Sequence, residues 1–174
     1  MNKFVGCGLA LATCLLTTVA SAQSFYLDAT NPSNAISLNL SAGSYQIAYD
    51  SGAWNPWGNV SGCSSNGQCT DKGWYNAFEF NTTSGETVVW DTIRWQTSDL
   101  AQASGQAHSP FTFTLASAQS VQFYIHDNPY SDNLGGIALS VTAVPEPETF
   151  AMMLAGLGLI GMICRRRSIA AANA

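Results

Sequence analysis

The chain has 174 residues, of which 47% are hydrophobic and only 10% are charged, and its formal net charge at pH 7 is −5. Residues 23–144 hold nine acidic residues against two basic ones, Lys72 and Arg94, so this part has a net charge of −7. Such a surplus of negative charge argues against nucleic acid and anionic lipid surfaces as partners, and favours divalent cations or neutral glycans. The length of this part is that of a single domain able to bury a core.

The first 22 residues are typical of a cleavable signal peptide. Lys3 supplies a positive start, residues 4–19 are mostly apolar, and Ala20 and Ala22 form the small-residue pattern that signal peptidase recognises. We therefore predict an exported protein whose mature chain begins at Gln23.

Residues 23–142 are expected to form an all-β domain. Eight short runs, bounded by turn-forming residues, either alternate between apolar and polar side chains or are rich in aromatic ones. No stretch of twelve residues shows a helical period, so 101–109 is predicted to be a polar loop. Eight short strands joined by turns predict an antiparallel β-sandwich of jelly-roll type. The runs are 25–27, 36–40, 45–49, 74–80, 87–95, 111–115, 121–125 and 137–141.

Cys63 and Cys69 are the cysteines that remain in the mature domain, because Cys7 and Cys14 leave with the signal peptide and Cys164 lies near the C-terminus. In an oxidising compartment this pair predicts a disulfide that closes a small loop. A metal site would need a second pair of cysteines or histidines nearby in the sequence, so the disulfide is the favoured interpretation.

Three oxygen-bearing side chains, those of Asp127, Asp132 and Asn133, lie within seven residues between two predicted strands. Hard oxygen ligands on a loop suit calcium better than zinc or copper. The alternative is an Asx-rich hairpin, in which Asp127 and Asp132 only accept hydrogen bonds from nearby backbone amides.

The same segment resembles the closing hairpin of PA-I-type galactose-binding calcium lectins and related jelly-roll modules. That resemblance implies one calcium held by Asp127, Asp132 and Asn133, with a backbone carbonyl from an aromatic-Gly pair that Trp57-Gly58 matches. It also implies that the hydroxyl groups of a bound sugar complete the coordination of the ion.

Aromatic residues bear on glycan binding, because an indole face can stack on a sugar ring. Trp54 and Trp57 lie just before the predicted disulfide loop and are the candidate stacking residues. The alternative is that they fill the core, which is the common location of large aromatic side chains.

Catalytic residues are harder to find. His126 adjoins Asp127, and His108 lies in the predicted polar loop, but no Gly-x-Ser-x-Gly motif provides a nucleophile. Glu79 and Glu86 flank a predicted hairpin turn without an identifiable cleft between them. We predict that the protein is not an enzyme; a hydrolase with an unrecognised site is the remaining alternative.

The last thirty residues have three parts in succession. Residues 143–149 form a linker that contains Pro145, Glu146 and Pro147, and residues 150–164 form an uncharged apolar run. Residues 165–174 begin with three arginines, Arg165, Arg166 and Arg167. As a helix the apolar run is about 22 Å long against about 30 Å for the hydrocarbon core, a deficit that snorkelling arginines reduce. The arginines place that end of a transmembrane helix in the cytoplasm.

This arrangement resembles the PEP-CTERM sorting tail of exopolysaccharide-producing Gram-negative bacteria. The resemblance implies cleavage near Pro145–Pro147 by exosortase, a membrane protease. It implies a precursor anchored in the inner membrane and a product at the cell surface or in the exopolysaccharide matrix of a biofilm. We expect a calcium-binding and glycan-binding domain there, or alternatively a structural matrix protein without a ligand.

Overall fold

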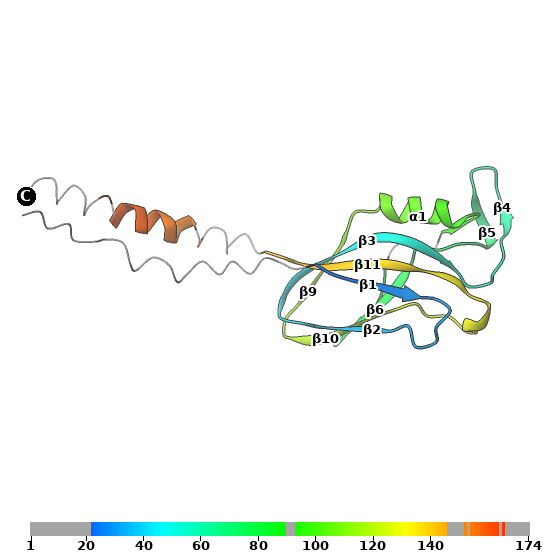
Figure 1. The fold of residues 1–174 in the computed structure, drawn as a ribbon, viewed down its shortest axis with the longest axis horizontal. Coiled ribbons are helices and arrows are strands. Elements are labelled where there is room, and N and C mark those ends of the chain that lie inside the picture. The colour runs from blue at the N-terminus through cyan, green and yellow to red at the C-terminus, as the bar shows by residue number, and fades with distance from the viewer. Residues whose placement is uncertain (1–21, 90–92, 146–151, 153, 164, 166–174) are drawn as a thin grey trace, which may run out of the picture.

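The computed structural model describes residues 22–89, 93–145, 152, 154–163 and 165. Their fold is dominated by antiparallel β-sheets, as predicted (Figure 1). Because residues 1–21 lie outside the described part, so does the predicted signal peptide with Ala20. Ala22 is exposed and directly precedes the first strand.

Two four-stranded sheets carry the domain. The first has the order β1-β11-β3-β9, formed by Gln23–Asp28, Leu134–Val144, Gly43–Asn55 and Phe111–Leu115. The second has the order β2-β10-β6-β7, formed by Ile36–Leu40, Gln119–Tyr124, Phe78–Thr82 and Gly85–Val89. A smaller sheet, β4-β5-β8, is formed by Ser61–Cys63, Gln68–Lys72 and Arg94–Trp95.

The inner faces of the two larger sheets share one apolar core. Phe123 of β10 is fully buried and lies 5.0 Å from Phe25 of β1, measured between ring centroids. Phe80 of β6 makes similar contacts with Phe111 and Phe113 of β9, at 5.8 and 5.1 Å. Contacts between aromatic rings at these distances stabilise the packing of one sheet on the other beyond the burial of area alone.

A helix replaces the polar loop predicted at 101–109, so that prediction is wrong. Helix α1 spans Ser98–Ala107 and is capped by Thr97, whose side chain accepts a hydrogen bond from the Leu100 amide. Its buried residues are Ala101 and Gly105. Because the buried face consists of such small residues, it lacks the bulky apolar repeat that identifies an amphipathic helix in a sequence.

Two of the predicted strands are shorter than expected. The run 74–80 becomes β6 only from Phe78, and Trp74 and Tyr75 form isolated bridges with Trp95 and Trp54. The run 87–95 is divided into β7 and β8, separated by residues 90–92 outside the described part. Strand β11, in contrast, is longer than predicted, because it continues to Val144, two residues past the predicted end of the domain.

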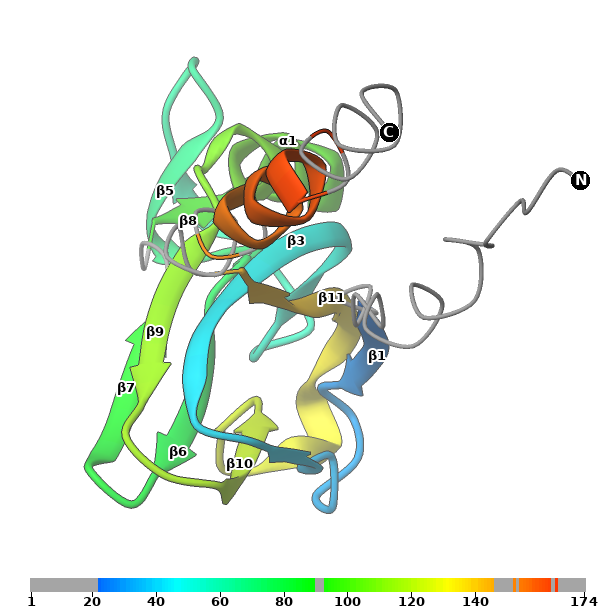
Figure 2. The same cartoon turned by 90° about the vertical axis from the view of Figure 1, so that its left-hand side faces the viewer.

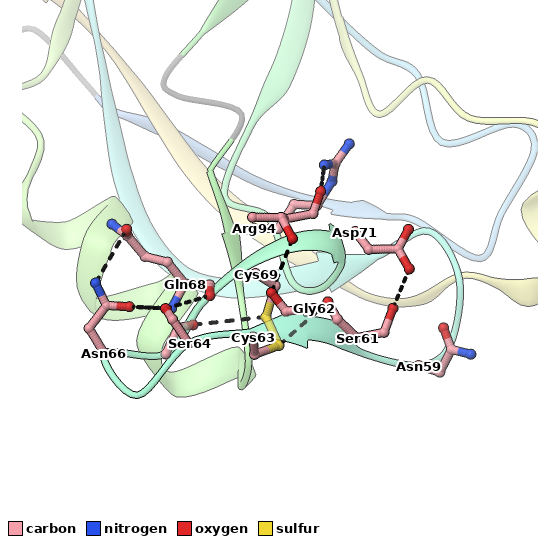
Figure 3. Close-up of a disulfide and its surroundings, with 12 residues drawn as sticks. Asn59, Ser61, Gly62, Cys63, Ser64, Asn66, Gln68, Cys69, Asp71 and Arg94 are labelled. Carbon is pink, nitrogen blue, oxygen red and sulfur yellow. Dashed lines mark hydrogen bonds between the residues drawn. A yellow bond between two sulfur atoms is a disulfide. The ribbon is translucent and has the colours of Figure 1, made fainter.

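The hairpin of β4 and β5 contains the predicted disulfide between Cys63 and Cys69 (Figure 3). The two cysteines are paired directly across the hairpin. A hydrogen bond of 2.6 Å from the Ser61 hydroxyl to Asp71 also links the two strands. These interactions hold a hairpin that otherwise has little apolar side chain to bury.

The strand register defines two ends of the domain (Figure 1), and Figure 2 views the domain from the side on which β11 ends. The tail end is where β1 begins and β11 finishes, and it includes the connections 41–42, 83–84 and 116–118. The loop end is opposite, and it includes the connections 29–35 and 125–133. The predicted calcium ligands therefore lie far from the point where the C-terminal tail leaves the domain.

The predicted membrane segment is helical where it is described, at residues 152 and 154–163. Its apolar side chains are exposed, for example Met152 at 74% and Leu159 at 63%. Within the described residues, no helix combines the length and apolar character needed to cross a membrane. Glu146, Pro147, Arg166 and Arg167 lie outside the described residues.

Candidate functional site

A pocket of about 230 Å³ opens at the loop end of the domain. It combines an aromatic wall with two carboxylates and a histidine, a composition suited to a small polar ligand with an apolar face. Three of the predicted site residues line this pocket: Trp54 and Trp57, and Asp127 much later in the chain. The lining residues are Trp54, Pro56, Trp57, Tyr75, Ala77, Phe78, Glu79, Val88, Ile125, His126 and Asp127.

Trp57 is half-buried and held in place by its neighbours. Its backbone amide donates a 3.0 Å hydrogen bond to the side chain of Asn55, which is itself buried. The guanidinium of Arg94 lies 5.2 Å from its ring centroid, and Tyr75 lies 5.8 Å away. Arg94 is fixed in turn by a 2.6 Å hydrogen bond to the Tyr75 hydroxyl. Trp57 therefore presents a pre-positioned aromatic surface to the pocket.

Trp54 has a different environment. Only 8% of the residue is exposed, and its indole N–H donates a 2.8 Å hydrogen bond to the Ala77 carbonyl. It belongs to the same hydrophobic cluster as Phe78 and Ile125. This burial does not support the predicted sugar-stacking role of Trp54, and matches the alternative of a core aromatic residue.

The three predicted side-chain ligands differ in exposure. Asp132 is exposed, Asp127 is half-buried and Asn133 is only 4% exposed. The Asn133 amide nitrogen donates a 2.8 Å hydrogen bond to the Ala29 carbonyl, which fixes the orientation of the side chain. Its carbonyl oxygen Oδ1 is buried and has no hydrogen-bond partner among the described residues. A buried acceptor without a donor costs about 1–3 kcal/mol, so this atom is suited to an additional ligand.

Asx turns do occur in this domain, but elsewhere. Asp28 Oδ1 accepts a 2.9 Å hydrogen bond from the Thr30 amide, and Asn31 Oδ1 accepts one of 2.8 Å from the Ser33 amide. Within the described part of the chain, neither Asp127 nor Asp132 accepts a hydrogen bond of this kind. The alternative interpretation of these two carboxylates, as backbone caps only, therefore lacks the contacts that it requires.

The turn at Trp57-Gly58 lies directly against the 127–133 loop. Gly58 has φ +63°, and a Cβ placed on it would be 3.0 Å from the carbonyl oxygen of Asp132. Any larger residue would press on that carbonyl, so glycine permits the close approach of the two segments. The fold thus brings the predicted carbonyl donor Trp57 next to the loop of predicted side-chain ligands.

The described residues contain no cluster of three or more His, Cys, Asp or Glu side chains able to hold a metal. The ligands predicted for the loop are of another kind: two carboxylates, the Asn133 amide oxygen and a backbone carbonyl. Calcium accepts such a mixture of oxygen donors, whereas zinc and copper prefer nitrogen and sulfur.

Glu79 is a pocket residue that the sequence alone did not identify as a site. One carboxylate oxygen is buried without a hydrogen-bond partner among the described residues, and His126 Nδ1 lies 3.8 Å from it. Burial raises the pKa of Glu79, neighbouring Glu86 raises it further, and His126 lowers it. Burial and the same two glutamates raise the pKa of Tyr124 to about 12. The register of β6 with β7 and β10 creates this cluster, which no local sequence pattern indicates.

We expect Glu79→Gln to stabilise the domain at neutral pH. Because the pKa of Glu79 is raised above its ordinary 4.5, its contribution to stability is present at low pH and is lost as the pH rises through that pKa. Thermal unfolding from pH 3 to pH 8 should therefore show similar melting temperatures for wild type and variant in acid, and a higher melting temperature for the variant at pH 7. Asp50→Asn is the control, and an equal gain there would contradict the assignment to Glu79.

The fold and tail define an exported β-sheet protein with a membrane-associated C-terminal sorting segment. Residues 143–168 match the PEP-CTERM protein-sorting motif, which implies processing by exosortase, a membrane protein. No curated protein and no solved structure was found to match the chain, and the lectin resemblance of the 127–133 loop is not confirmed by these comparisons.

Proposed function

We propose that this protein is anchored transiently in the inner membrane of a Gram-negative bacterium and is then cut near Pro145–Pro147. The product is a component of the cell surface or of the exopolysaccharide matrix. The matched sorting motif at 143–168 supports this route. The end of β11 at Val144 supports it as well, since the folded domain stops immediately before Pro145.

The domain is proposed to be a jelly roll. Along the chain, β1, β2 and β3 alternate between the two four-stranded sheets, and β9, β10 and β11 do so again. Of the eight strands in those sheets, β6 and β7 alone are consecutive neighbours in one sheet. Repeated crossing between two antiparallel sheets is the connectivity of a jelly roll.

The loop end is proposed to bind one calcium ion through Asp127, Asp132, Asn133 and the backbone carbonyl of Trp57. The observation that carries this proposal is the buried Asn133 Oδ1, which is oriented by its amide contact with Ala29 and lacks a donor among the described residues. An ion at that position would offset the cost of the unsatisfied oxygen and would be neutralised by the carboxylates proposed to bind it, those of Asp127 and Asp132.

A glycan is the proposed partner of the neighbouring pocket. Asp127 is shared between the proposed calcium site and the pocket, so an ion held there lies within reach of a ligand's hydroxyl groups. Trp57 supplies an aromatic surface for the apolar face of a sugar ring, and Glu79 supplies a buried acceptor for a hydroxyl. Of the two predicted stacking residues, Trp57 alone is proposed to stack on the sugar ring.

Retention on the producing cell's own polysaccharide tests this function. The tail-cleaved protein should stay on immobilised polysaccharide in millimolar calcium and elute with a chelator, and Trp57→Ala should elute earlier than wild type. Tyr26→Ala is the matched control, because it removes an exposed aromatic ring that does not line the pocket. Phe113→Ala is less suitable, because it would damage the core. Retention that the chelator does not change would favour the alternative, a matrix protein without a calcium-dependent ligand.

No catalytic role is proposed. His126 is 67% exposed and contacts Glu79, but the cluster supplies no nucleophile with an adjacent base. The prediction that the protein is not an enzyme stays a prediction. Release of sugars from the polysaccharide, lost in Glu79→Gln, would instead favour a hydrolase.

A further inference from the structure

The tail end of the domain carries no ionisable side chain in its connections. These are the exposed segments Ser41-Ala42, Thr83-Ser84 and Ala116-Ser117-Ala118. They surround the start of β1 and the end of β11, where Val144 pairs with Ser44 and Gln23 pairs with Val141. The surface from which the sorting tail departs is therefore formed by small and hydroxyl-bearing residues.

The negative charge of the domain is placed away from this end. Among the described acidic residues, Glu86 lies nearest to the tail end; it follows Gly85, the first residue after the Thr83-Ser84 turn. Asp28 closes β1 at the loop end, and Asp127 and Asp132 lie in the loop-end connection. A domain with a net charge of −7 thus has one end whose connections are uncharged, and the tail, which itself carries Glu146 and Glu148, is attached to that end.

The tail holds that end close to the bilayer. Five residues, 145–149, separate the last paired residue, Val144, from the apolar run that begins at Phe150. Fully extended, five residues span at most about 18 Å. About 5–8 Å of that length crosses the headgroup region, which follows from the total and hydrocarbon thicknesses of a bilayer. The remaining length keeps the tail end within at most about 10–13 Å of the lipid surface, which is between one and two Debye lengths of roughly 8 Å each.

With so short a tether, electrostatic repulsion from the membrane favours an orientation that keeps the acidic side chains away from the lipid. Acidic side chains held within one to two Debye lengths of an anionic membrane are repelled more strongly than side chains several Debye lengths away, which are screened. The eleven residues of β11 separate the two ends, and at about 3.3 Å per residue the loop end lies more than three Debye lengths farther out.

From this geometry we infer that the tail end is a membrane-facing surface, which rests against the lipid headgroups while the precursor is anchored. The proposed calcium and glycan site then points away from the membrane, free to engage its ligand before the tail is cut. The partner of the tail end is the headgroup layer of the bilayer itself. This inference rests on the proposed membrane anchoring of the tail.

Fluorescence quenching on vesicles tests the orientation. The chain from Gln23 to Ala174, with Cys164→Ser, carries one fluorophore at either Ser117→Cys on the tail end or Ser33→Cys on the loop end; both positions are exposed. Phosphatidylglycerol vesicles contain lipids with a quencher on the headgroup. We expect several-fold stronger quenching at position 117 than at position 33.

The possible outcomes separate the two claims. Equal quenching at both positions, or stronger quenching at position 33, in protein bound to vesicles would overturn the orientation and leave the anchoring intact. Failure of the chain to bind vesicles at all would overturn both.

Charge variants provide a second measurement. Ser41→Asp, Ser84→Asp and Ser117→Asp together should weaken binding to phosphatidylglycerol vesicles, by up to about fivefold per added charge. The matched set Ser33→Asp, Ala35→Asp and Ser65→Asp adds the same charge at exposed positions near the loop end and should leave binding nearly unchanged. Equal weakening by both sets would contradict a membrane-facing tail end.

Discussion

Replacement of Pro145, Glu146 and Pro147 by alanine should leave the precursor uncleaved in the inner membrane. Pro145 follows the last pair of the β11 ladder and has no N–H to donate, so the strand ends there. Alanine restores the missing donors and relaxes the backbone, and it removes the carboxylate of Glu146 as well. We expect processing to fall to near zero, measured by pulse-chase labelling and fractionation.

A control with the same composition separates the motif from a general effect on folding. Pro32→Ala, Glu86→Ala and Pro110→Ala replace two prolines and one glutamate at exposed positions outside the tail. That variant should be processed at the wild-type rate. Normal release of the Pro145–Pro147 variant would refute the proposed sorting route.

The second large effect is expected at the calcium loop. Asp127→Asn retains the shape of the side chain but removes one of two carboxylates from the proposed ligand set. Calcium affinity depends on the number of charged ligands, and even partners outside the coordination shell are worth about 10–100-fold in metal affinity. We expect at least that loss in a calcium titration of the tail-cleaved protein, and a similar loss for Asp132→Asn.

Asp28→Asn is the matched control, since it makes the same substitution at the same end of the domain. Asp28 accepts hydrogen bonds from the backbone amide and hydroxyl of Thr30, and asparagine can keep both through its amide oxygen. Its calcium affinity should equal that of wild type. Equal losses in all three variants would indicate nonspecific attraction of calcium to an acidic surface.

Much of the β-architecture could be predicted, because alternation of apolar and polar residues is a local signal. Strand β9, for example, has the predicted bounds, and its Phe113 packs against Phe80 of the opposite sheet. Helix α1 could not be predicted in this way. Its contact with β3 includes Gly105 against the ring of Tyr49 and hydrogen bonds made by the side chains of Gln102 and Gln106, and neither glycine nor glutamine carries a hydrophobic signal.

The candidate site was only partly predictable for a related reason. Loop residues such as Asp127 and Asn133 are recognisable, since oxygen donors cluster within a few positions of the sequence. The roles of Trp54 and Glu79 depend on pairing between strands that are distant in the chain. Trp54 is buried by its bridge to Tyr75, and Glu79 is brought opposite Tyr124 by the register of β6 and β10.

The sorting tail and the proposed ligand site lie at the two ends of the domain. The match at 143–168 implies export with a membrane-associated tail, and the strand register places that tail and the 127–133 loop at opposite ends. We propose that an anchored precursor therefore presents its candidate site away from the membrane.

Thermal unfolding of the tail-cleaved protein, with calcium and with a chelator, tests the proposed site most directly. Extracellular calcium modules bind with dissociation constants of about 10⁻⁴–10⁻³ M, so about 10 mM calcium is at least a tenfold excess. Such an excess stabilises a protein by about 1.4 kcal/mol, which raises the melting temperature of a domain this size by about 3–7 °C. We predict that rise for the wild-type protein and its absence in Asp127→Asn. Identical melting of the wild-type protein in calcium and in chelator would contradict the proposed calcium site.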